Sequence, residues 1–320
     1  MKNPRLVFMG SPDFALPSFH VACEFTQKNQ GSILGVFTQP DRPKGRGKKM
    51  QPVGVAIKAM ELGFVLFQPN SLKKGDDAKE AITFLKKQKP DCIIVVAYGL
   101  LLPKEVLDIP RLGCINVHAS LLPQYRGAAP AQWAIANGET KTGITTMKLD
   151  EGLDTGPILL QEELEIKPEE YADELLESLS KVGAALLGET LTGLFQGTLK
   201  PKPQPKEGTY APLLKKELAQ VDWTKPAPEI FNCMRGFYPW PGSKTTYQGE
   251  MIKIHRARCG SNRDKGQPGE ILSVSPEGIT VQAGRGTTLV LLKIQSPGGT
   301  PQNVADYLRG NPIQAGILLN

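Results

Sequence analysis

The side chains of this chain with the clearest chemical potential are a carboxamide, an imidazole and a carboxylate. Asn116 and His118 lie two apart in the short apolar run CINVH, and Asp154 follows in the Gly-rich turn DEGLDTGP. Residues two apart in a strand project from the same face. A carboxamide can donate a hydrogen bond to a carbonyl oxygen, an imidazole can move protons, and a carboxylate can orient the imidazole or an ordered water. Together these side chains suit group transfer at a carbonyl carbon.

Three other interpretations compete with this one. A nucleophilic triad needs Ser120 within reach of His118, but the two are only two residues apart and the G-x-S-x-G elbow is missing. One histidine with no second histidine nearby is a poor ligand set, so we expect no metal. A structural role is the third: His118 tied to a backbone group in the core, and the carboxylates of DEGLDTGP capping a turn. The Pro- and Gly-rich loop that follows His118 favours a site.

Alternating strands and helices are expected to position these residues. The sequence predicts strands at 5–10, 32–38, 64–67, 91–97 and 142–149, with helices at 53–62, 79–89 and 171–196. Near-continuous apolar strands that alternate with helices indicate a parallel sheet covered on both faces. Open sheets of this kind bind ligands where a strand ends in polar residues and a helix follows, as after CINVH. Tyr98 and Gly99 follow the strand at 91–97, so we expect them to wall a pocket beside His118.

Two common phosphate-binding motifs do not fit the sequence. GSPDFA, after the first strand, has Pro and Asp where a dinucleotide pyrophosphate needs glycine, which argues against a nicotinamide or flavin cofactor. GRGKK, within 41–51, lacks the glycine spacing and the hydroxyl of a P-loop. The segment 41–51 is therefore predicted to be a mobile surface loop, whose cations suit contacts to phosphates.

The region 197–208 separates two parts of the chain that differ in their sequence pattern. It reads GTLKPKPQPKEG, contains three Pro and lacks apolar periodicity, which is typical of a linker. Short strand candidates then recur at 245–247, 251–257, 269–275, 278–283 and 287–294. Short strands separated by turns indicate a small β-barrel. We therefore expect a catalytic domain at 1–197, a linker at 198–208 and a second domain at 209–320.

Positive charge is spread unevenly over the 320 residues. Residues 1–200 carry equal numbers of basic and acidic side chains, whereas residues 201–320 carry the whole net charge of +6. Within the first part, residues 41–50 hold five basic groups and one acid. Two separate basic zones suggest a large polyanionic partner, and a small cationic barrel is a common way to bind nucleic acid. The alternative is a cationic surface that only aids solubility.

The remaining composition indicates an ordinary globular protein. No apolar run approaches the roughly 20 residues that span a bilayer, so we expect no membrane contact. The segment MKNPRLVFMG lacks the long apolar stretch and cleavage site of a signal peptide. The five cysteines are scattered without C-x-x-C, which argues against a disulfide framework and a zinc site. A reducing cytoplasm fits best, and a monomer is the default expectation.

The motifs of this chain resemble those of the folate-dependent formyltransferases, which use 10-formyltetrahydrofolate, and in particular those that act on methionyl-tRNA. The resemblance covers nearly the whole chain in family order. Its motifs are FMGSPDFA, GVFTQPDRPKGRGKKMQP, VVAYGLLLP, NVHASLLPQYRGAAP, TGITTMKLDEGLDTGP, TYAPLLKKE and RGFYPWPGS. The resemblance implies a Rossmann-like domain of the formyltransferase fold with a mostly parallel sheet, followed by a small OB-type β-barrel that binds tRNA.

The resemblance also implies roles for individual residues. Asn116, His118 and Asp154 occupy the positions of the family's catalytic residues. The S-L-L-P segment lines the family's folate site, which together with the pocket residues gives the predicted folate contacts Tyr98, Gly99, Ser120, Leu121, Leu122 and Pro123. The basic loop contacts the acceptor end of tRNA, and its cations here are Arg42, Lys44, Arg46, Lys48 and Lys49. Leu213 stands where many relatives have a basic residue, so one tRNA contact of the family is in doubt.

The expected reaction is transfer of the formyl group from 10-formyltetrahydrofolate to the α-amino group of initiator methionyl-tRNA, for translation initiation. The neutral amine is expected to attack the formyl carbon directly, through a tetrahedral intermediate. His118 or a water held with Asp154 is the expected base. Competing hypotheses are a formyltransferase that acts on an amino-sugar nucleotide or another small amine, an RNA-binding protein on a retired enzyme fold, and a hydrolase that releases formate from the same donor.

Overall fold

The chain forms two compact units. The computed structural model describes residues 3–44, 49–261 and 266–320, with the backbone alone at 42–44 and 49. Unit 1 comprises residues 1–127, 142–164 and 176–210, and unit 2 comprises residues 128–141, 165–175 and 211–320. The second unit therefore includes two short stretches from the first half of the sequence as well as the C-terminal third.

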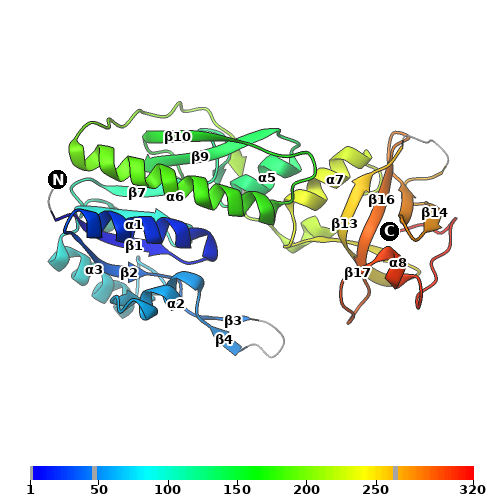
Figure 1. Ribbon diagram of the computed structural model, residues 1–320, viewed down its shortest axis with the longest axis horizontal. Coiled ribbons are helices and arrows are strands. Elements are labelled where there is room, and N and C mark those ends of the chain that lie inside the picture. Colours follow the sequence, from blue (N-terminus) through cyan, green and yellow to red (C-terminus); the bar gives the residue numbers. More distant parts are fainter. Residues whose placement is uncertain (1–2, 45–48, 262–265) are drawn as a thin grey trace. The chain divides into compact units, whose positions relative to one another are not determined.

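A seven-stranded, mostly parallel sheet forms the centre of unit 1 (Figure 1). In spatial order its strands are β10 (Ile158–Glu165), β9 (Lys141–Lys148), β7 (Cys114–His118), β6 (Cys92–Val96), β1 (Arg5–Gly10), β2 (Ser32–Phe37) and β5 (Leu66–Phe67). The strands from β5 to β7 are parallel, whereas β9 pairs with β7 in the antiparallel direction. The order of the strands reverses beside β1, which creates the crevice typical of ligand sites in open α/β sheets.

Helices cover both faces of this sheet because its strands are apolar on both sides. The helices are η1 (Asp13–Ala15), α1 (Leu16–Lys28), α2 (Gly54–Glu61), α3 (Asp76–Gln88), α4 (Lys104–Leu107) and α6 (Ala172–Gln196). Val7 and Met9 of β1 are buried in one cluster with Leu85 of α3. Phe8, on the opposite side of β1, lies 5.0 Å from Phe19 of α1 between ring centroids. Figure 1 shows α1 and α6 across the near face.

Unit 2 is built on an antiparallel sheet with a core of its own. Its strands are β12 (Ser243–Tyr247), β13 (Glu250–Cys259), β16 (Thr288–Gln295), β15 (Gly278–Gln282) and β14 (Ile271–Ser275), with β17 (Gln302–Asn303) paired to β16. Its helices are α5 (Pro130–Ala136), η2 (Lys216–Ala219), α7 (Ala227–Gly236) and α8 (Val304–Tyr307). The Arg256 guanidinium lies 3.8 Å and 4.3 Å from the ring centroids of Tyr171 and Tyr238, which fixes the segment around Tyr171 to the barrel strands.

The predicted fold class is confirmed, with two local differences. The segment 41–51, predicted as a loop, contains β3 (Arg42–Lys44) paired antiparallel with β4 (Lys49–Gln51), so a short hairpin replaces irregular structure. β8 (Arg126–Gly127) pairs with β11 (Tyr210–Ala211), which the sequence did not predict. Within the described residues, none of the helices has the length and apolar character needed to cross a bilayer.

Candidate functional site

Strand β7 presents Asn116 and His118 from one face of the sheet. On the other face, a Cβ added to Gly183 of α6 would come within 2.9 Å of Cγ1 of Val117. Since side chains alternate along a strand, Asn116 and His118 point away from α6. His118 is buried and Asn116 is half-buried. Among the described residues the Asn116 carboxamide has no hydrogen-bond partner, which leaves its donors available to a ligand.

Asp154 meets His118 at this face. Its Oδ2 atom lies 3.7 Å from Nδ1 of His118, and its side chain is 13% exposed against 6% for His118. The same Oδ2 atom accepts a hydrogen bond of 2.9 Å from the backbone N–H of Gly127. Asp154 has a φ of 52°, so its backbone is left-handed, a conformation that non-glycine residues rarely adopt. The surrounding contacts therefore hold the carboxylate in a specific place.

The route by which Asp154 reaches His118 differs from the expected one. The sequence places Asp154 after the strand predicted at 142–149, and a parallel strand there would put His118 and Asp154 at neighbouring strand ends. Strand β9 is antiparallel to β7: Lys148, at its end, pairs with Ile115, while His118 pairs with Thr145. The segment after β9 must return along the sheet to bring Asp154 back to His118. Asp150 organises this turn by accepting hydrogen bonds from the N–H of Gly152 and the hydroxyl of Thr155.

The hydrogen-bond partner of His118 determines its neutral tautomer. Nε2 of His118 lies 2.9 Å from the carbonyl oxygen of Tyr125. A carbonyl oxygen only accepts, so Nε2 carries the proton and donates it. In the neutral imidazole the other nitrogen, Nδ1, is then unprotonated and faces Asp154. The arrangement is that of a base whose protonated form has a carboxylate beside it.

The S-L-L-P segment is fixed by side chains from neighbouring strands. The hydroxyl of Ser120 donates to the carbonyl of Gln124 at 2.6 Å, so its proton is engaged in the turn. The N–H of Leu122 donates to Oγ1 of Thr145, and the carbonyl of Leu122 accepts from Nε2 of Gln161. Leu122 itself is buried. Leu121 and Pro123 are half-buried, so they are the apolar side chains of this segment that can reach a ligand.

Tyr98 and Gly99 lie at the end of β6, beside the point where the strand order reverses. The Tyr98 ring is 1% exposed and belongs to the apolar core, where burial raises the pKa of its hydroxyl well above the ordinary value. Its carbonyl oxygen accepts from Ser11 and from Gln39. Gly99 has a φ of 77°, and a Cβ there would lie 2.1 Å from Nε2 of Gln39, so glycine is required.

The five basic residues predicted to contact tRNA fall in or beside the part of the chain that is not described. Arg46 and Lys48 lie outside the described residues. The backbones of Arg42 and Lys44 form β3, and that of Lys49 begins β4.

Two side chains near the site, Arg126 and Gln204, were not predicted. Gln204 donates to the carbonyl oxygens of Asp154 and Gly156, and its own oxygen accepts from Arg126. Arg126 lies inside the central motif, but Gln204 lies in the proposed linker, where the three prolines gave no sign of a specific contact. No group of three possible metal ligands occurs among the described residues.

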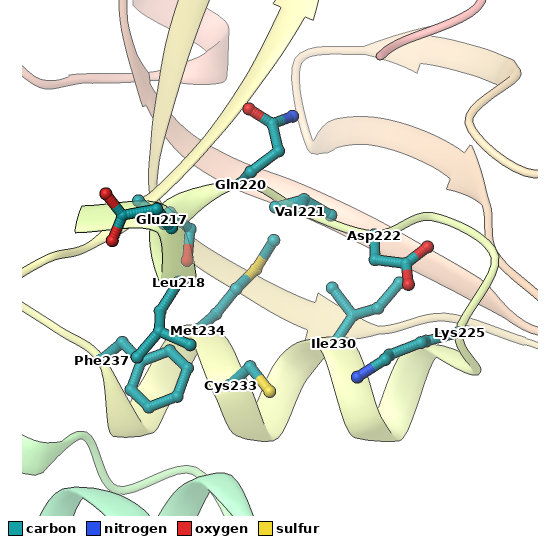
Figure 2. A pocket seen from close by; sticks show the side chains of 12 residues that line it. Glu217, Leu218, Gln220, Val221, Asp222, Lys225, Ile230, Cys233, Met234 and Phe237 are labelled. Atoms are coloured by element: carbon teal, nitrogen blue, oxygen red, sulfur yellow. The ribbon is translucent and has the colours of Figure 1, made fainter. Parts of the chain in front are cut away.

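Unit 2 contains a separate cavity of about 200 Å³. Figure 2 shows Ile230 and Met234 of α7, and Phe237 directly after this helix, beside the segment that holds Leu218 and Val221. Asp222 and Lys225 also line this cavity (Figure 2). Its lining includes none of the residues predicted for the site, and we assign it no part in the chemistry.

Comparison with known proteins identifies the family. A family model described as "Formyl transferase" matches residues 5–191, and one described as "Formyl transferase, C-terminal domain" matches residues 213–312. The chain is 45% identical over its whole length to a methionyl-tRNA formyltransferase of Trichlorobacter lovleyi, of which it covers 98%. It is 47% identical to one of Alkaliphilus metalliredigens, with 98% of each chain covered.

Solved structures show the same fold at lower identity. A N-formyltransferase of Helicobacter canadensis, in complex with folinic acid and dTDP-3-aminofucose, superposes with a TM-score of 0.65 at 18% identity, over 92% of this chain and all of that one. HypX of Aquifex aeolicus with tetrahydrofolic acid gives a TM-score of 0.63 at 19% identity, over 96% of this chain and 47% of that one. Sequence identity over the full length carries the assignment: the chain belongs to the methionyl-tRNA formyltransferase family.

Proposed function

We propose that the protein transfers the formyl group of 10-formyltetrahydrofolate to the α-amino group of initiator methionyl-tRNA. The observation that carries this proposal is the meeting of His118 and Asp154, 3.7 Å apart, on the sheet face that also presents the carboxamide of Asn116. The chain is 45% and 46% identical to two methionyl-tRNA formyltransferases over nearly its whole length, which supports the assignment of both substrates. The reaction serves translation initiation, and its place is the cytoplasm.

The first step is the attack of the neutral amine on the formyl carbon. As the C–N bond forms, the amine becomes acidic and its proton passes to Nδ1 of His118, which the hydrogen bond to Tyr125 leaves unprotonated. The resulting imidazolium is paired with the carboxylate of Asp154. The hydrogen bond from the N–H of Gly127 to Oδ2 keeps the Asp154 carboxylate turned toward the imidazolium.

The second step is the collapse of the tetrahedral intermediate. The formyl oxygen carries negative charge in this intermediate, and the Asn116 carboxamide donates a hydrogen bond to it. The bond between the formyl carbon and N10 of the folate then breaks. The imidazolium of His118 returns its proton to N10, so the products are tetrahydrofolate and N-formylmethionyl-tRNA. The protons and electrons balance without a covalent enzyme intermediate.

The substrate contacts follow the same proposal. Leu121 and Pro123 are assigned to the folate, with the buried Leu122 and Ser120 shaping the turn beneath them. Arg42, Lys44, Arg46, Lys48 and Lys49 are assigned to the acceptor end of the tRNA, and the barrel at 209–320 to the tRNA body. The catalytic domain is assigned to 1–197 with the joining segment at 198–208. The protein acts as a monomer in this proposal.

An acceptor panel tests the proposal. Purified protein with 10-formyltetrahydrofolate is given charged initiator methionyl-tRNA, free methionine, a dTDP-amino sugar or no acceptor, and tetrahydrofolate and the formylated acceptor are measured. Formylation with methionyl-tRNA alone supports the proposal. Formylation of the amino sugar, or formate release without an acceptor, contradicts it.

A further inference from the structure

Gln204 differs in burial from its neighbours in the proline-rich segment 198–208, which the sequence predicts to be a linker. Among residues 201–210, all of which are described, Gln204 is the only one whose side chain is not exposed. The segment is fixed at both sides of it. Lys202 exchanges two backbone hydrogen bonds with Ile158, and the hydroxyl of Thr209 accepts from the N–H of Tyr125. The chain around Gln204 is therefore held against the site.

The carboxamide of Gln204 uses both of its polar atoms on the site. Its Nε2 donates to the carbonyl oxygen of Asp154 at 2.9 Å and to that of Gly156 at 2.7 Å. Its Oε1 accepts from Nε and Nη2 of Arg126 at 3.2 Å and 2.9 Å. A carboxamide has two N–H donors and one oxygen with two lone pairs, so this residue is fully satisfied.

Arg126 completes a closed ring of contacts around Asp154. Its neighbour in the chain, Gly127, donates its N–H to the Asp154 carboxylate. The carbonyl of Asp154 is held by Gln204, and Gln204 is held by Arg126. Arg126 also donates to the carbonyls of Pro205 and Lys206, which fixes the backbone on the far side of Gln204. Asp154 is thus held at its side chain by Gly127 of β8 and at its backbone by Gln204, which Arg126 of the same strand holds in turn.

We infer that Gln204 is a positioning residue for the formyl transfer, which acts by holding Asp154 in its left-handed conformation opposite His118. The inference rests on the catalytic role proposed for Asp154. The left-handed backbone of a non-glycine residue persists only where its surroundings impose it. Gln204 supplies donors that do so, because its contacts to the carbonyls of Asp154 and Gly156 fix the peptide that follows Asp154 and the peptide that follows Gly156.

Substitutions can separate the donor from the acceptor function. Gln204→Glu keeps an oxygen for Arg126 but has no N–H for the two carbonyls, and it places a negative charge against them. Gln204→Ala removes both functions. If the donors matter, both variants lose activity, and Gln204→Glu gives no rescue. Gln196→Ala, at the exposed last residue of α6, is the matched control.

The experiment measures the rate of a single turnover of methionyl-tRNA formylation with enzyme in excess, and kcat and KM for both substrates in the steady state. Misplacement of a reacting group by about 1 Å can cost on the order of 100-fold in rate. We expect kcat to fall about 10- to 100-fold in Gln204→Ala and Gln204→Glu, with each KM within about 3-fold of wild type. The far-UV circular dichroism and the rate of Gln196→Ala are expected to match wild type.

A double-mutant cycle then shows whether Gln204 acts through Asp154. In an Asp154→Asn background, adding Gln204→Ala is expected to change the rate by less than about 3-fold, because the group it positions is already lost. A full, multiplied loss in that background overturns the inference in favour of a general structural role. A wild-type rate for Gln204→Ala while Asp154→Asn is impaired overturns the inference alone. A wild-type rate for Asp154→Asn overturns both the inference and the catalytic role of Asp154.

Discussion

Nδ1 of His118 faces Oδ2 of Asp154 across 3.7 Å, although the strands that lead to the two residues run in opposite directions. This separation is longer than a hydrogen bond. Catalytic hydrogen bonds are often long in structures without substrate and tighten in the reactive complex. The pair therefore supports a mechanism in which His118 takes up a proton and the carboxylate of Asp154 stabilises the resulting positive charge.

Removal of the imidazole tests the proton transfer. His118→Ala is expected to lower kcat about 100- to 10,000-fold, the usual contribution of a general acid or base. His118 is buried, so the thermal unfolding midpoint must be measured beside the rate to separate chemistry from folding. A folded variant with a wild-type rate is the contrary result.

Removal of the carboxamide tests the stabilisation of negative charge. Asn116→Ala is expected to lower kcat about 100- to 1,000-fold, the range seen when one oxyanion donor is removed. Since Asn116 has no partner within the described part of the chain, the substitution leaves no protein group unpaired and stability should change little. A large rise in KM at constant kcat would assign Asn116 to substrate binding instead.

The turn that carries Asp154 has no room for a side chain at Gly156. A Cβ there would lie 1.9 Å from the backbone oxygen of Lys148, which cannot move without disturbing β9. Gly156→Ala is expected to cost about 1–3 kcal/mol in the free energy of unfolding, as overpacking does, and to lower kcat by displacing Asp154. Gly310→Ala is the control, because a Cβ there meets nothing within 4 Å. Equal stability of the two variants in urea would count against the tight turn.

The buried thiol of Cys114 gives stability a defined pH dependence. Burial raises its pKa from the ordinary 9.0 to about 12. Above pH 9 the thiol ionises in the unfolded chain but stays protonated in the folded one, so the unfolded state binds fewer protons and the free energy of unfolding falls. Between pH 9 and 11 the free energy of unfolding of the wild type should fall more steeply with pH than that of Cys114→Ala, by up to about 1.4 kcal/mol per pH unit. Urea titrations at pH 8, 9, 10 and 11 measure both slopes. If the free energy of unfolding falls equally with pH in both proteins, the buried thiol does not cause the pH dependence.

The elements that the sequence predicts well are those in which burial dominates. The run CIIVV is fully buried in β6, and Leu6 to Gly10 are buried in β1, so an unbroken apolar run was a direct signal. The position of β7, with two polar residues on one face, also follows from alternation. Helix α7 was not predicted because it lies between segments rich in Pro and Gly, a composition that is typical of turns and short strands.

The sequence predicts the candidate site less completely than it predicts the fold. Asn116 and His118 were found because they share a strand, but the direction of β9 relative to β7 has no signature in the apolar pattern. The burial of the Tyr98 ring in the apolar core could not be predicted from the residue type, because tyrosine is common both in cores and on pocket walls. Gln204 was missed since its hydrogen bonds go to the backbone carbonyls of Asp154 and Gly156, and such contacts leave no trace in residue types.

The most direct test of the account is the rate at which Asp154→Asn formylates initiator methionyl-tRNA in a single turnover with 10-formyltetrahydrofolate. Asparagine keeps the shape of the side chain and an acceptor for Gly127 but cannot pair with the charged imidazole of His118. We predict a loss of about 100-fold or more in this single-turnover rate, with unchanged binding of both substrates. A folded Asp154→Asn protein that makes N-formylmethionyl-tRNA at the wild-type rate would contradict the account.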